Sequence, residues 1–241
     1  MSASTAIVLS AEVVGPRSLT SAVYERLRGD ILTARLLPGQ KLNIAHLSKG
    51  FGVSLAATRE ALSRLVADGL VRAIDQRGFR VSPVSDADLR DLTRTRIDIE
   101  GLALRRSIEQ GGKDWLAAVE GAFASLLAVP YRNPVDPKIH NEAWLALHRV
   151  LHRTLVSACG SPWLLRFRDI LYEQSERYRL LSIPMDPDLR DVDAEHRQIV
   201  DAALGRDADA AVAALAAHFY RTEELVMRRT VSIHQEAEPI A

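Results

Sequence analysis

The sequence has 241 residues, of which 47% are hydrophobic and 26% charged, and 31 Lys and Arg balance 31 Asp and Glu. This composition is typical of a soluble globular protein of one large or two modest domains, and it excludes a chain that is disordered or collagen-like throughout. The single cysteine, Cys159, excludes an internal disulfide and a thiolate zinc cluster, and it fits a reducing cytoplasm.

Charge divides the chain into two parts although its sum is zero. Residues 1–85 hold 11 Lys and Arg against 6 Asp and Glu, a net +5, and residues 86–241 hold 20 against 25, a net −5. Such asymmetry indicates that the first part meets a polyanion. No apolar run approaches the roughly 20 residues that span a bilayer, and residues 1–16 carry Glu12 and no basic leader. We therefore expect no membrane partner and a cytoplasmic location.

Three helices are predicted at the start of the chain. Residues 18–37 form the first, because apolar side chains recur there at four-residue spacing: Val23, Leu27 and Ile31. Asn43 can cap a short second helix, and Ser54 can cap a third that ends before Gly69. The last two helices have the spacing of a helix-turn-helix.

A β-hairpin is predicted directly after these helices. Residues 70–74 and 79–81 are short β-type runs, joined by a turn at residues 75–78. A helix, a helix-turn-helix and a basic-tipped hairpin together indicate a winged-helix DNA-binding domain over residues 18–84, preceded by a flexible arm at residues 1–17.

The residues with DNA-binding chemistry cluster at the start of the third helix and at the hairpin tip. The second helix of a helix-turn-helix directs its N-terminal residues, here Ser54, Thr58 and Arg59, toward base edges in the major groove. Arg59 can contact a guanine or a phosphate, and Thr58 can offer its hydroxyl or methyl group. Arg77, beside flexible Gly78, can touch the DNA backbone or the minor groove. The same spacing also fits solvated arginines on a small helical module.

A family pattern favours the DNA-binding interpretation. The segment at residues 37–81 reads LPGQKL…LSKGFGVSLAATREALSRLVADGLV…RGFRV. It resembles the DNA-binding domain of the GntR superfamily of bacterial transcription regulators. Two positions depart from the pattern, because Leu55 and Ala45 replace arginines that the family commonly uses. The resemblance implies DNA binding through Arg59, and it does not carry over an operator sequence.

The second part of the chain is predicted to be an antiparallel bundle of about six helices. Gly and Pro separate the helical segments, and there is no β-type alternation. The segments are residues 86–110, 113–129, 141–159, 162–181, 192–204 and 208–231. The fold class is therefore mainly α, with a winged helix followed by a helical domain at residues 85–232 and a tail at residues 233–241.

Four of the seven histidines lie inside predicted helices of this bundle. His148 and His152 are four residues apart and share one helix face. His196 and His218 lie at similar heights from the turn at Gly205, on two antiparallel helices. Four converging imidazoles would bind a divalent transition-metal ion such as zinc or nickel. Histidines that pack incidentally in a core would give the same spacing, so the pattern alone leaves both interpretations open.

Two segments carry a second resemblance. HRVLHRTLVSACGSPWL and EHRQIVDAALGRDADAAVAALAAHF are similar to the FCD effector domain of the FadR-like GntR subgroup. The resemblance implies that His152, His196 and His218 are metal ligands, and that His148 replaces the usual aspartate or asparagine. Ser161 stands where the family often has asparagine. One divalent ion per chain, held by four histidines, is the implied variant.

An ion held by neutral imidazoles keeps its positive charge and attracts a carboxylate. Arg96 is the candidate for a second contact to such an effector, although a salt bridge with a nearby acid fits it equally. The resemblance implies a homodimeric, metal-dependent transcription regulator that responds to a small organic acid. Such a dimer would bind a pseudo-palindromic operator in double-stranded DNA.

Two other functions fit part of the pattern: a metal-binding helical-bundle enzyme, and a dimerising DNA-binding protein with no effector. A hydrolytic zinc site needs H-E-x-x-H, but residues 148–152 read H-R-V-L-H. A di-iron bundle needs Glu-x-x-His motifs, but none of the four histidines has a glutamate three residues before it. The one acidic residue at that spacing is Asp193, before His196. We therefore predict a regulator and not an enzyme.

Overall fold

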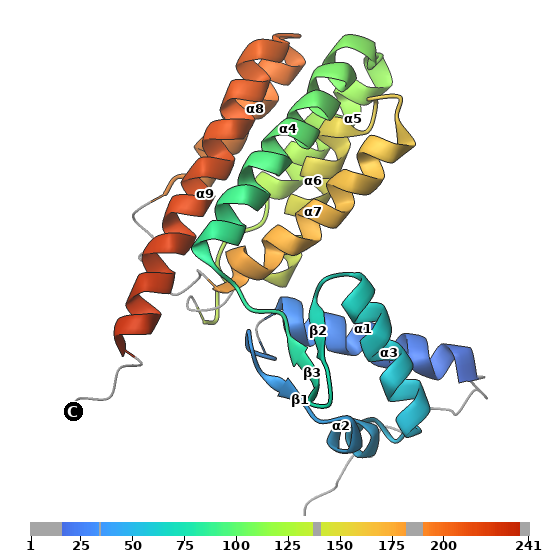
Figure 1. The fold of residues 1–241 in the computed structure, drawn as a ribbon. Coiled ribbons are helices and arrows are strands. Elements are labelled where there is room, and N and C mark those ends of the chain that lie inside the picture. Colours follow the sequence, from blue (N-terminus) through green and yellow to red (C-terminus); the bar gives the residue numbers. More distant parts are fainter. Residues whose placement is uncertain (1–15, 34, 137–140, 182–189, 237–241) are drawn as a thin grey trace, which may run out of the picture. The chain divides into compact units, whose positions relative to one another are not determined.

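The computed structural model describes residues 16–33, 35–136, 141–181 and 190–236 (Figure 1). The chain divides into two compact units, Met1–Pro83 and Val84–Ala241. The predicted arm lies outside the described residues except for its last two positions, and so do residues 237–241 of the predicted tail.

In its described part, the first unit holds three helices and a small antiparallel sheet. The helices are α1 (Pro16–Leu32), α2 (Ile44–Phe51) and α3 (Leu55–Ala67). The strands are β1 (Lys41–Leu42), β2 (Val71–Ile74) and β3 (Gly78–Val81), in the order β1-β3-β2. Strands β2 and β3 pair from Val71 opposite Val81 to Ile74 opposite Gly78, and they form the predicted hairpin.

Local sequence features set the bounds of these helices. The side chains of Asn43 and Ser54 accept hydrogen bonds from the backbone N–H groups of His46 and Ala57, at 3.0 and 3.1 Å, so both are the predicted caps. Helix α1 begins at Pro16, two residues before the predicted start, because proline suits the first turn of a helix. Strand β1 was not predicted.

The core of the first unit forms between α1, α3 and the sheet. The predicted stripe on α1, Val23, Leu27 and Ile31, is buried. It packs in one cluster with Leu62 and Leu65 of α3 and with apolar residues of the sheet. This core fixes α3 with its opposite face exposed.

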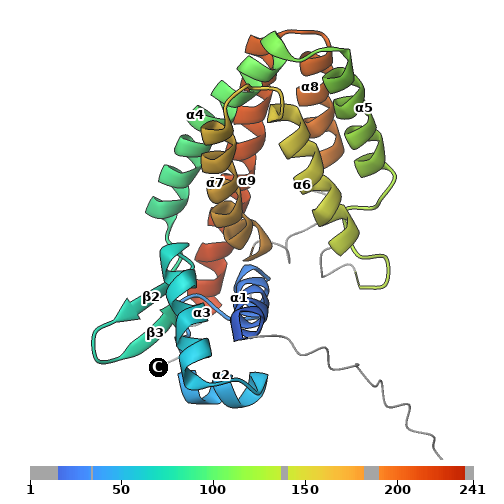
Figure 2. The ribbon, with the colours of Figure 1, turned by 90° about the vertical axis from the view of Figure 1, so that its right-hand side faces the viewer.

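Six helices make up the described part of the second unit. They are α4 (Asp86–Gln110), α5 (Lys113–Leu127), α6 (Glu142–Val156), α7 (Pro162–Leu181), α8 (Val192–Leu204) and α9 (Ala208–Glu236). Helix α4 lies against α7 and α9, and α8 lies against α9 and α5 (Figures 1 and 2). Consecutive helices run in opposite directions (Figure 2). The predicted fold class, a winged helix-turn-helix followed by an antiparallel helical bundle, is confirmed.

One apolar core runs through the middle of this bundle. Its fully buried members come from every helix except α7, and they include Leu104, Val119, Leu151, Ile199 and Ala211. Polar residues of α6, α8 and α9 interrupt the core at one level, which is the place of the histidines. None of the helices that the structure describes combines the length and the apolar character required to cross a bilayer.

Candidate metal centre and nucleic-acid interface

Four buried histidines meet inside the helical bundle. His148 and His152 lie one turn apart on α6, His196 lies on α8 and His218 lies on α9. None exposes more than 5% of its surface, and one ring nitrogen of each lies within 4.8 Å of those of the others. The Nε2 atoms of His152 and His196 are 3.3 Å apart. The structure thus brings together all four histidines that the sequence singled out.

Burial keeps these imidazoles neutral. It lowers the pKa of His148, His152 and His196 well below the ordinary value, and the neighbouring histidines lower each of them further. The pKa of His218 falls to about 4, because burial outweighs the opposing hydrogen bond to Glu195. Neutral imidazoles present a lone pair to a metal ion, so this set is ready to bind one without first losing protons.

Partners outside the cluster orient two of the rings. His218 Nδ1 lies 2.8 Å from a carboxylate oxygen of Glu195, which Arg190 holds through two hydrogen bonds of 2.8 and 2.6 Å. Burial raises the pKa of Glu195, but the hydrogen bonds from His218 and Arg190 lower it to about 2, so Glu195 is a carboxylate and can accept a hydrogen bond from the Nδ1–H group of His218. His148 Nδ1 lies 3.2 Å from the Tyr172 hydroxyl. Both contacts leave Nε2 of the ring for the cluster, as outer partners of metal-bound histidines do.

This donor set fits a divalent transition metal. Four nitrogens placed about 2.0–2.1 Å from a tetrahedral zinc ion lie roughly 3.4 Å from one another. The Nε2 atoms of His152 and His196 have this spacing, at 3.3 Å, whereas the nitrogens of the whole set lie within 4.8 Å of one another and would move closer together around an ion. Imidazole suits zinc and nickel, and four neutral ligands would leave the charge of the ion uncompensated.

Two buried arginines share one carboxylate beside the histidines. Arg96 of α4 donates to one oxygen of Glu100 at 2.8 Å, and Arg168 of α7 donates to the other at 3.2 Å. Besides burial and the neighbouring histidines, both guanidinium charges lower the pKa of His152. The guanidinium of Arg96 also lies 3.9 Å from the ring centroid of Phe219, which follows His218 in the chain. Glu100 is thus shared by two guanidinium groups, and Arg168 has Asp169 as a second acidic partner.

Arg168 has unused hydrogen-bonding capacity. Its Nη2 atom is buried and has no hydrogen-bond partner among the described residues, whereas its Nη1 atom donates to Asp169 at 3.1 Å. The sequence had indicated Arg96 alone. Arg168 was missed because its partner Glu100 is 68 residues away in the chain, although Glu195 could have been found from its place directly before His196.

Helix α3 presents only part of its predicted DNA-binding set to solvent. Arg59 is exposed, and no hydrogen bond or ion pair of Arg59 occurs within the described part of the chain. Ser54 is exposed, and its hydroxyl oxygen caps the helix by accepting a hydrogen bond from the backbone N–H of Ala57. Thr58 is fully buried, and its hydroxyl donates to the Ser54 carbonyl at 3.2 Å and lies 3.4 Å from the Ser48 hydroxyl oxygen. Thr58 therefore supports the turn between α2 and α3, which argues against the base contact expected of it.

The hairpin tip has the exposure that the sequence suggested. The backbone N–H of Arg77 donates to the Ile74 carbonyl at 2.9 Å and closes the turn. Gln76 and Gly78 have φ angles of 57° and 82°, and glycine adopts this region without strain. The side chain of Arg77 is exposed at the tip. It is available to a phosphate.

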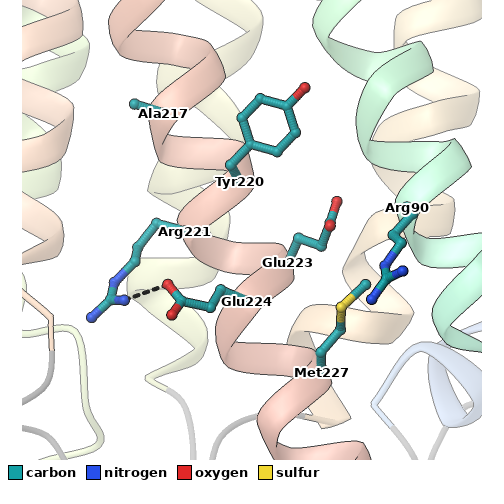
Figure 3. Close-up of a pocket in the computed structure, with 7 residues that line it drawn as sticks. All are labelled: Arg90, Ala217, Tyr220, Arg221, Glu223, Glu224 and Met227. Carbon is teal, nitrogen blue, oxygen red and sulfur yellow. Dashed lines mark hydrogen bonds and ion pairs between the residues drawn. The ribbon is translucent and has the colours of Figure 1, made fainter.

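A separate hollow lies between α4 and α9 on the surface of the bundle (Figure 3). Its volume is about 600 Å³, and Tyr220, Glu223 and Met227 of α9 face Arg90 of α4 across it. Arg221 and Glu224 form an ion pair at its edge. None of the four histidines lines this hollow, so it is distinct from the histidine cluster.

Two families match the two units. Residues 19–81 match the family described as bacterial regulatory proteins, gntR family, and residues 91–221, more than half of the chain, match the FCD domain. The chain is 42% identical over 206 residues to the uncharacterized HTH-type transcriptional regulator BphR of Paraburkholderia xenovorans (strain LB400), covering 86% of this chain and 84% of that one. It is 33% identical over 191 residues to the HTH-type transcriptional repressor GlaR of Escherichia coli (strain K12), covering 76% and 84%.

Solved structures share the fold. E. coli McbR/YncC superposes with a TM-score of 0.71 at 20% identity, over 88% of this chain and 99% of that one. A putative GntR transcriptional regulator from Rhodococcus sp. RHA1 superposes with a TM-score of 0.69 at 20% identity, over 86% and 97%. Both relatives and the Rhodococcus neighbour are described as transcriptional regulators or repressors, in agreement with the expectation of a regulator and not an enzyme.

Proposed function

The chain belongs to the GntR family of bacterial transcription regulators and carries an FCD domain, and from this premise we propose that it is a metal-dependent regulator that responds to a small organic acid. It would act in the cytoplasm as a homodimer on a pseudo-palindromic operator. Its winged helix would read the DNA through Arg59 and Arg77, with Ser54 holding the start of α3. Its bundle would sense the acid.

The convergence of four neutral, buried imidazoles carries this proposal. Their nitrogens lie within 4.8 Å of one another, and Glu195 and Tyr172 orient two of the rings. One zinc or nickel ion per chain would be held by His148, His152, His196 and His218. When bound, the ion supplies a positive charge that attracts an anion, and the protein supplies the surrounding buried guanidinium groups.

An acid with more than one carboxylate fits these surroundings best. One carboxylate would meet the ion, and a second would meet Arg168, whose buried Nη2 atom has no hydrogen-bond partner in the described part of the chain. Arg96 would add its charge. Charge-assisted hydrogen bonds to guanidinium are strong, and a buried donor without a hydrogen-bond partner is unfavourable. The ligand would therefore relieve an unsatisfied group that the free protein contains.

A thermal-shift comparison tests the effector. For the zinc-loaded protein, citrate or succinate should raise the melting temperature by several degrees and acetate by less, because saturating ligand adds about 2–3 kcal/mol of stability. Arg168→Met should remove the difference between these acids while metal content stays unchanged. Arg105→Met, on the surface of α4, should behave as wild type. If no acid shifts the melting temperature, the alternative of a DNA-binding protein without effector replaces the proposal.

Helix α7 offers a route from the effector to the DNA-binding unit. Arg168 and Tyr172 lie at the histidines, and Tyr178 lies at the end of the bundle where α4 begins. The hydroxyl of Tyr178 donates to Asp88 and accepts a hydrogen bond from the backbone N–H of Ser85 at 3.4 Å. Ser85 caps α4 just after the boundary with the winged helix. A shift of α7 on effector binding would therefore change the anchoring of this boundary.

Helix α7 also carries the surface that we assign to the dimer. Trp163, Phe167 and Ile170 follow one another at helical spacing and are 64%, 50% and 49% exposed. Arg166 and Asp169 line a hollow beside Ile170, so the face offers both signs of charge. A face that combines aromatic residues with both charges suits contact with a second copy related by a twofold axis.

A further inference from the structure

An exposed leucine occupies the first position of the DNA-reading helix. Leu55 begins α3 and is 57% exposed. Among the described residues, it belongs neither to the buried core of the first unit nor to the partly buried residues that pack against that core. Folding therefore gives no reason for a large apolar side chain at this position.

Leu55 and Arg59 share one face of α3. They are four residues apart, so both project from the same side of the helix, one turn from each other. The other polar side chains of this turn are used within the protein, because Ser54 caps the helix and Thr58 is buried. Ala45 of α2 and Ala56 of α3 are exposed and carry no polar atoms on their side chains. On the face that would meet base edges, Leu55 is thus the apolar side chain and Arg59 the cationic side chain that could contact a base.

The base edge that suits an apolar reader in the major groove is thymine, which alone presents a methyl group there. We propose that Leu55 makes the protein select thymine by contact with the C5-methyl group, next to the base that Arg59 reads. The inference rests on the proposed DNA-binding function. Four residues of helix rise about 6 Å and neighbouring base pairs are about 3.4 Å apart, so the two positions lie within about two base pairs.

Removal of single methyl groups from DNA tests this inference directly. Operators are first selected from random duplexes with the full-length protein, and each thymine is then replaced by deoxyuridine, which keeps the hydrogen bonds and lacks the methyl group. Wild-type protein should lose about fourfold in affinity at one position in each half-site, as burial of one methyl group predicts. Leu55→Ala should bind the thymine and deoxyuridine operators equally at that position. Leu55→Arg should select guanine there.

Leu37 supplies a matched control, because it is also 57% exposed in the same unit and lies outside α3. Leu37→Ala should keep the methyl sensitivity of wild type. Equal wild-type affinity for every deoxyuridine operator would overturn the inference, and so would sensitivity that survives in Leu55→Ala. If wild-type protein selects no sequence from the random pool, the proposed DNA-binding function itself fails, and that outcome is distinct from the first two.

Discussion

Two neighbouring residues of α3 differ sharply in what their surroundings let them do. Thr58 is fully buried and bonds to Ser48 and Ser54, so it holds the helix-turn-helix together. Arg59, the next residue, is exposed and pairs with nothing in the described part of the chain. Sequence alone assigned both to DNA, because helical spacing places them near the same end of the helix but does not distinguish the buried face until the core is known.

Arg59→Ala should abolish specific DNA binding. A bidentate arginine contact contributes about 1–3 kcal/mol per half-site, so a dimer should lose at least roughly 30-fold in operator affinity. The bundle should stay folded and bind metal as wild type does, because Arg59 belongs to the other unit. Footprinting with the purified variant measures the effect. A footprint like that of wild type would refute the role of Arg59.

The histidines show which side-chain contacts can be predicted from the sequence. The four-residue spacing of His148 and His152, and the distances of His196 and His218 from Gly205, were enough to expect convergence, because helix geometry is regular. The Glu100 pair with Arg96 and Arg168 was not expected as a whole, since Arg168 comes from a helix whose rotation against α4 depends on packing. Regular local geometry can be read from spacing, whereas contacts between distant helices cannot.

At the scale of elements, periodic patterns predicted more than short ones. The stripe on α1 and the caps Asn43 and Ser54 appear as predicted. Strand β1 has only two residues, Lys41 and Leu42, which is too short for any alternation to show. It forms because residues 40–42 pair with β3, and this tertiary contact cannot be predicted from the local sequence.

Tyr178→Phe should weaken the response of DNA binding to effector. The change removes the hydroxyl that joins α7 to Asp88 and Ser85, and one such hydrogen bond contributes about 1 kcal/mol, or roughly fivefold. Operator affinity is measured with and without the organic acid that gives the largest thermal shift. The ratio of the two affinities should fall, whereas Tyr220→Phe, exposed on α9, should leave it unchanged. A wild-type ratio in Tyr178→Phe would exclude this route.

Phe167→Glu should weaken dimerisation. A charge at the centre of the apolar face on α7 should raise the dimer dissociation constant by about 30-fold or more, the effect of losing a central aromatic contact. Sedimentation equilibrium measures the constant. Leu102→Glu, at an exposed leucine of α4, is the control and should dimerise as wild type. An unchanged constant for Phe167→Glu would place the dimer contact elsewhere.

At the scale of the whole molecule, the zero net charge is the sum of two unlike units. The basic part contains α3 and the hairpin tip, and the acidic part contains the bundle with its histidines and buried arginines. Because the chain has one cysteine, a thiolate metal cluster is excluded and histidines would have to supply the ligands. The bundle brings four histidines together. The proposed metal-dependent regulation therefore depends most on whether this cluster holds an ion.

Metal analysis of the full-length protein, prepared without an affinity tag, tests that claim most directly. Wild-type protein should contain about one equivalent of zinc or nickel per chain, and His152→Ala should contain less than about a tenth, because its imidazole is one of four ligands. His46→Ala, at an exposed histidine of α2, should match wild type. A wild-type protein with less than about a tenth of an equivalent, whose melting temperature does not change on chelation, would contradict the account.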